Sequence, residues 1–323
     1  MAYQNVSQCR FYISYGDWWR STGITVPRFQ TISPNETSSI TVGASYSFMS
    51  DYTALPSSSL VTGINWFAAL NHNVTSDFGF RCKHWISGTQ QDIGLGGWDT
   101  MVNIGNSGEP TYQGFSLGTW NTPWTDAGTD SVYVGLQGVS GTEPDTSFDV
   151  GCWVYGGYYD MPHSPDLSLT LGYETGTKTI ETRGGASLSN TMWRPPMWGE
   201  LGAWELSDPN SPTTGQKLAH SSRRIWNLSF SFLDKTNIFP KYNALNRLID
   251  SNDTLPDDET LLTSDDFFSS VWNKVGTALP FIFQPDKDNN SEFAICKFDQ
   301  KSFSFQQTAP NLYSVKMKIR EVW

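Results

Sequence analysis

The sequence predicts a mainly β protein with two parts. An antiparallel, jelly-roll-like β-sandwich is expected over residues 1–163, and a second β-sandwich or split barrel with one flanking α-helix over residues 164–323. Aromatic residues make up 14% of the chain and charged residues only 16%, with 28 glycines, which is typical of aromatic-filled sheets joined by tight turns. Apolar residues also recur at every second position in short runs, the period of a strand with one buried face. A chain of 323 residues is long enough for two cores.

The first part opens and closes with aromatic runs, RFYISYGDWW at residues 10–19 and DVGCWVYGGYYD at residues 149–160. Between them lie short runs separated by Gly, Ser, Pro and Asp, with no helical period of useful length. Pairing of the first strand with the last would suit a jelly roll. The predicted boundary is MPHSPD at residues 161–166, where the two prolines around His163 interrupt any continuous strand.

The second part shows a defined order of elements. Residues 166–183 alternate around a Glu-Thr-Gly-Thr turn and predict a β-hairpin. The run RIWNLSFSFL at residues 224–233 predicts a long strand, with its buried face formed by Trp226, Leu228, Phe230 and Phe232.

A helix is expected over residues 264–275, with Ser264 as its N-cap and Gly276 at its end. Short strands follow at residues 279–285, 292–299 and 302–307. In the final strand, Tyr313, Val315, Met317 and Ile319 alternate with Ser314, Lys316, Lys318 and Arg320. One face of this strand should therefore lie on a core, and the other should carry a basic row.

This order, with the runs SFSF, PFIFQP, FAICKFD and NLYSVKMKIREVW, resembles the lambda-like minor tail and distal tail proteins of tailed bacteriophages over about residues 166–323. The resemblance implies a tail-tube-like fold and a virion structural protein that forms a ring around the DNA channel and connects neighbouring tail proteins. It implies a homo-oligomer, a hexamer with a trimer as the alternative, through whose lumen DNA only passes. A Pro-, Gly- and Trp-rich excursion at residues 194–216 departs from the family's pattern.

The charge distribution suggests an interface. The net charge is −11, the opposite sign from that of a DNA-wrapping protein. Residues 249–266 hold seven carboxylates and no Lys or Arg, including Asp257, Asp258 and Glu259. The spacing of a calcium-binding EF-hand is absent, so a solvated loop is the simplest interpretation. In a ring, these acids would form a candidate subunit interface or lumen lining, facing Lys316, Lys318 and Arg320 of the next copy.

A carbohydrate-binding, lectin-like receptor-binding protein is the alternative function, with Trp98, Trp120 and Trp124 as candidate docking aromatics. We expect no enzymatic activity and no cofactor, because the sequence contains no H-E-x-x-H or P-loop motif. The four cysteines form no C-x-x-C pair, so we expect buried free thiols rather than a metal site.

No long apolar segment predicts membrane insertion, and the first ten residues lack the apolar core of a signal peptide. A lectin acting outside the cell would need such a signal. We therefore expect synthesis in the host cytoplasm and incorporation into the virion.

Overall fold

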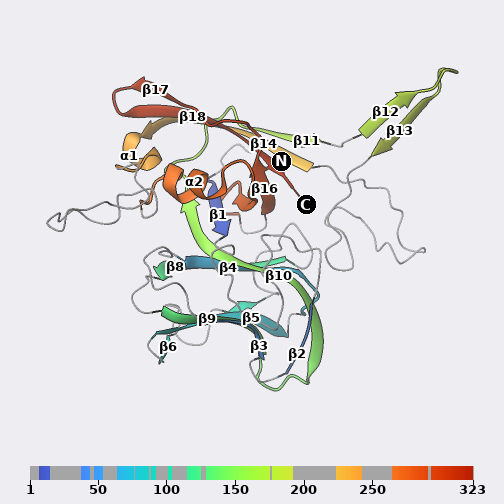
Figure 1. Cartoon of the computed structure of the whole chain (residues 1–323), viewed down its shortest axis with the longest axis vertical. Coiled ribbons are helices and arrows are strands. Elements are labelled where there is room, and N and C mark those ends of the chain that lie inside the picture. Colours follow the sequence, from blue (N-terminus) through green and yellow to red (C-terminus); the bar gives the residue numbers. More distant parts are fainter. Residues whose placement is uncertain are drawn as a thin grey trace.

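The computed structural model describes residues 7–14, 38–43, 47–53, 64–75, 77–86, 89–91, 101–103, 115–124, 129–174, 177–191, 223–241, 264–289 and 292–322. In these residues the protein is mainly β, as predicted, with three short helical segments (Figure 1). These are α1 (Lys235–Ile238), the π-helix η3 (Phe268–Trp272) and α2 (Asn273–Val275).

Eleven strands form one antiparallel sheet in the order β11-β14-β18-β16-β15-β1-β10-β4-β8, with β17 beside β18 and β2 beside β10. Their bounds are β1 (Arg10–Ser14), β2 (Ser38–Val42), β4 (Ile64–His72), β8 (Phe115–Trp124), β10 (Thr146–Asp160), β11 (Thr170–Glu174), β14 (Arg223–Asp234), β15 (Phe281–Gln284), β16 (Ala294–Phe298), β17 (Phe305–Ala309) and β18 (Leu312–Glu321).

A second sheet has the order β3-β9-β5-β6, with β7 beside β5. Its strands are β3 (Ser47–Thr53), β5 (Phe78–Ile86), β6 (Thr89–Gln91), β7 (Met101–Asn103) and β9 (Thr129–Gly138). It lies face to face with the β8-β4-β10 portion of the large sheet (Figure 1). Phe67, Phe80 and Leu136 are buried in the core between the layers, and the rings of Phe78 and Phe148 meet edge to face at 4.7 Å. The predicted N-terminal sandwich is therefore confirmed.

Strand β1 holds the central place in the large sheet. It pairs with β10 in the register Arg10↔Asp160 and with β15 in the register Phe11↔Phe283. The first pairing confirms that residues 10–14 and 156–160, which belong to the two aromatic runs, lie side by side. The second joins this part to residues from the end of the chain, so the sheet continues across the predicted boundary at residue 163. The division into two parts stays a prediction.

The long strand β14 is confirmed, with one correction. Trp226, Leu228 and Phe230 are buried as predicted, but Phe232 is 73% exposed. The register with β18 shifts between Phe230 and Leu233, and Leu233 takes the inward position instead. Such a bulge inserts extra residues into one strand and reverses which side chain faces the core.

The predicted helix is present but begins differently. Its apolar stripe is buried at Phe267, Val271 and Val275, and it ends at Gly276, whose φ of 52° suits glycine. Ser264 is not the cap; the backbone N–H of Ser269 donates to the Asp266 carboxylate at 2.9 Å. Part of the segment is a π-helix, with a wider turn than an α-helix.

The predicted hairpin over residues 166–183 is wrong. Strand β11 pairs with β14, whereas β12 (Thr177–Glu181) pairs with β13 (Ser187–Thr191) in a separate two-stranded sheet. The turn of the real hairpin lies at Gly185, whose φ of 78° favours glycine. The Gly184–Gly185 dipeptide was the sequence signal for this turn.

Candidate assembly surface

A two-stranded arm, β12 with β13, projects from the body of the protein (Figure 1). Residues 177–189 are all exposed. Ile180 lies opposite Leu188 in the arm, and these side chains are 60% and 61% exposed. Since an isolated two-stranded hairpin is only marginally stable in water, an arm with an apolar cross-strand pair offers a surface that a partner would cover.

More apolar side chains are exposed on the segment that leads into the arm. Leu167 is 91% and Tyr173 is 61% exposed, before and within β11. Among the described residues, seven large hydrophobic side chains are exposed, and four of them are Leu167, Tyr173, Ile180 and Leu188. We call this stretch the 167–188 surface. Of these four, Ile180 and Leu188 lie opposite each other, and exposed apolar residues that lie together mark interaction sites more often than single ones do.

The bulge of β14 lies beside the beginning of this surface. The Asp166 carboxylate accepts the backbone N–H of Ser231 at 3.3 Å and its hydroxyl at 2.9 Å. The next residue, Phe232, has a φ of 61°, which is unfavourable for a bulky side chain. A strained, exposed aromatic residue is thus held in place next to a segment that already exposes Leu167.

The predicted basic row occupies the outer face of β18. Lys318 Nζ lies 2.7 Å from Asp299 Oδ2. Arg320 Nε lies 3.6 Å from Glu174 Oε2, and its Nη1 lies 3.8 Å from Asp299 Oδ1. Lys316 is exposed, and no described carboxylate forms an ion pair with it. The structure therefore brings the three predicted cations together, with acidic partners from β11 and the end of β16 that the sequence did not indicate.

The other predicted interface residues are not placed. Asp257, Asp258, Glu259 and Trp98 lie outside the described residues, as does the excursion at residues 194–216. Trp120 and Trp124 lie on β8, but their side chains are not among those that the structure describes.

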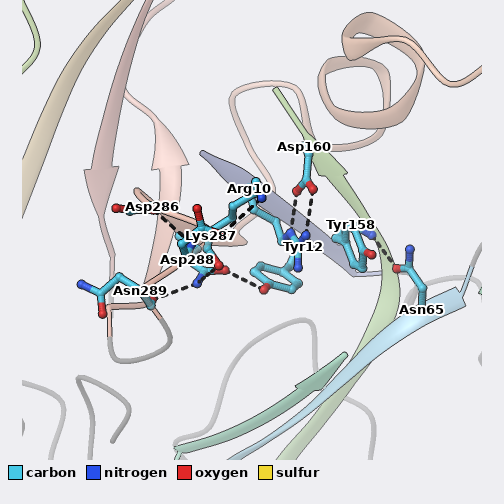
Figure 2. Close-up of polar contacts among 10 residues, drawn as sticks. Arg10, Tyr12, Asn65, Tyr158, Asp160, Asp286, Lys287, Asp288 and Asn289 are labelled. Carbon is cyan, nitrogen blue, oxygen red and sulfur yellow. Dashed lines mark hydrogen bonds and ion pairs between the residues drawn. The ribbon is translucent and has the colours of Figure 1, made fainter. Parts of the chain in front are cut away.

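A polar network fixes β1 between β10 and β15 (Figure 2). The Arg10 guanidinium donates to both Asp160 oxygens at 2.5 and 2.8 Å and lies 3.9 Å from the centre of the Tyr158 ring. The Tyr12 hydroxyl donates to Gln284 Oε1 at 2.8 Å. These contacts join β10, β1 and β15, so they serve to position strands.

Two buried polar groups also have structural partners. Arg224 forms two hydrogen bonds with the Glu321 carboxylate, at 2.9 and 3.1 Å, and both side chains are buried. His72 Nε2 lies 2.9 Å from the Ser116 hydroxyl. Burial lowers the pKa of His72 to about 3, so this imidazole is neutral at neutral pH.

The described residues contain no group of three or more His, Cys, Asp or Glu side chains that could hold a metal ion. Cys9 and Cys296 are buried free thiols, as predicted. Burial raises the pKa of both, which keeps them protonated and unreactive. The side chains of Cys82 and Cys152 are outside the description.

Within the described part of the chain, no helix has the length and apolar character needed to cross a membrane. No family model matches the sequence, and neither a curated protein nor a solved structure matches the chain.

Proposed function

We propose that this protein is a structural subunit of a bacteriophage tail, a distal or minor tail protein. Its copies form a closed ring around the DNA channel and connect neighbouring tail proteins. A ring of six copies is favoured, with three as the alternative. The 167–188 surface is the observation that carries the proposal, and the resemblance of residues 166–323 to tail proteins supports the tail as its location.

The arm suits contact with another copy. Burying a large apolar side chain contributes about 1.5–3 kcal/mol, and Ile180 and Leu188 retain more than half of their surface in the single chain. An arm that docks on a different surface of the next copy makes a head-to-tail contact. Contacts of that type close into rings when the rotation between copies permits.

The body of the protein suits a rigid ring element. Strand β1 links β10 to β15 within one sheet, so load applied at one part is transmitted through backbone hydrogen bonds. The net charge of −11 repels phosphates. This charge suits a channel through which DNA passes without binding, rather than a surface that binds DNA.

Electron microscopy tests the proposal in two ways. The purified full chain should form rings of uniform diameter in negative stain. An antibody against the chain should label the tails of the phage particles whose genome encodes it. Particles that lack the chain would overturn the proposal. A chain that stays monomeric and binds a bacterial polysaccharide at micromolar concentration would instead support the receptor-binding alternative.

A further inference from the structure

Five cations share the outer face of three neighbouring strands in the large sheet. In the antiparallel register, Lys297 of β16 lies directly opposite Arg320 of β18, which in turn lies opposite Ile225 of β14. Residues two apart on a strand point to the same side, so Lys316 and Lys318 share the face with Arg320, and Arg223 shares it with Ile225. We call these five residues the basic face: Arg223, Lys297, Lys316, Lys318 and Arg320.

The basic face differs in charge from the rest of the protein. Two carboxylates, Glu174 and Asp299, form ion pairs with it. Among the described residues, five cations and these two carboxylates sum to +3, on a chain whose total is −11. Lys297 and Arg320 lie directly opposite each other, and like charges in such cross-strand positions destabilise a sheet. Burial and the nearby charge of Arg320 also lower the pKa of Arg223. A face that concentrates repelling charges is suited to an anionic partner.

We propose that the basic face binds the acidic segment of residues 249–263 from a neighbouring copy, an inference that rests on the ring assembly proposed above. This segment carries five carboxylates and no Lys or Arg: Asp250, Asp253, Asp257, Asp258 and Glu259. It belongs to the 22 residues between Lys241 and Ser264, a length that spans at most about 3.3–3.6 Å per residue when extended. Such a segment is long enough to extend from one subunit toward the next.

Charge complementarity favours this occupant over DNA. A duplex carries one negative charge for about every 1.7 Å of its axis and binds proteins that neutralise many phosphates at once. Here Lys318 and Arg320 already share Asp299, which leaves few cations for a duplex. A short segment with clustered carboxylates matches a small face better. Contacts of this kind orient partners and fix which surfaces meet.

Charge reversal in the full-length protein tests the inference. Lys297→Glu with Lys316→Glu changes two cations that form no ion pair with any described carboxylate. The Lys297→Glu change places a carboxylate opposite Arg320, and because the two charges attract, the change should not destabilise the fold. We expect the concentration at which rings form to rise at least tenfold. Asp257→Lys with Asp258→Lys should have the same effect, and the four changes combined should restore assembly to within about threefold of the wild type.

The control is Lys235→Glu with Lys287→Glu, which makes the same change in net charge away from the basic face and should leave assembly unchanged. Light scattering at 50 and 300 mM NaCl would measure ring formation, and circular dichroism would check the fold. Because surface charges are screened by salt, the expected difference between wild type and variants shrinks at the higher concentration.

Several outcomes would overturn the inference. If rings of the Lys297→Glu, Lys316→Glu variant form as in the wild type, the basic face is not an interface, while the proposed ring assembly stands. Loss of assembly that the combined variant does not restore excludes the 249–263 segment as the partner. If the charge reversals change the stability of the monomer but not its assembly, the basic face pairs with the 249–263 segment of its own chain. Binding of a fluorescent DNA duplex by the wild type, lost on reversal of the basic face, identifies DNA as the occupant. A wild type that forms no rings counts against the proposed function itself.

Discussion

Phe11→Ala removes the side chain through which β1 packs against the strands and helix of the C-terminal part. Phe11 is fully buried. Its ring lies 5.3–6.1 Å from the rings of four other phenylalanines: Phe267, Phe281, Phe283 and Phe298. Truncating a buried Phe to Ala costs about 3–5 kcal/mol, a large share of the roughly 5–15 kcal/mol that stabilises a typical domain. We expect the free energy of unfolding to fall by about this amount.

The assay is equilibrium unfolding in urea, followed by tryptophan fluorescence and circular dichroism on the full chain. Phe232→Ala is the matched control, because it removes the same group from an exposed position with a φ of 61°. Surface substitutions usually change stability by about 0.5 kcal/mol or less. A loss below about 1 kcal/mol for Phe11→Ala, or equal losses for the two variants, would refute the placement of β1 in the shared core.

Three further predictions follow from the core. Burial lowers the pKa of folded His72 to about 3 from 6.5, so the unfolded chain binds more protons between these pH values. Stability should fall as the pH drops from about 6.5 toward 3, by about 1.4 kcal/mol per pH unit. His72→Leu should reduce this slope in denaturation curves; an equal slope in the wild type and the variant would argue against a buried neutral imidazole. Deleting residues 311–323 removes the buried Val315, Met317 and Ile319, each worth about 1.5–3 kcal/mol, so circular dichroism should show a C-terminal part that no longer folds. A fragment of residues 164–323 lacks β1 and should gain stable structure only when a peptide of residues 7–14 is added; independent folding would show that β1 is dispensable there.

The alternation of apolar and polar residues predicted those strands in which every second side chain is buried without interruption. Trp226, Leu228 and Phe230 follow one another at every second position, so their burial could be predicted from this segment alone. The bulge after Phe230 is different. It depends on the register with β18 and on the clamp from Asp166, neither of which is local in sequence, so the pattern placed Phe232 inside.

Pairing partners were harder to predict than strands. Residues 170–174 and 177–181 both alternate and lie on either side of a plausible turn, yet β11 pairs with β14 and β12 with β13. The position of β1 between β10 and β15 depends on pairings such as Arg10↔Asp160 and Arg10↔Gln284, which join residues far apart in the sequence.

For the candidate site, alternation predicted the basic row on one face of β18. Alternation alone does not indicate the acidic side chains that reach this row. Glu174 and Asp299 come from other parts of the sheet, and only the fold places them there.

Light scattering of the wild type and of the Ile180→Asp, Leu188→Asp double variant tests the central claim most directly, namely that the arm mediates assembly. Both side chains are exposed in the single chain, so the variant should keep the circular dichroism spectrum of the wild type. We predict that the wild type has the mass of one closed ring and that the variant has the mass of a monomer. Val139→Asp, at an exposed position in the loop after β9, should assemble as the wild type does. A double variant that forms the same ring, or a wild type that remains monomeric at every concentration, would contradict the account.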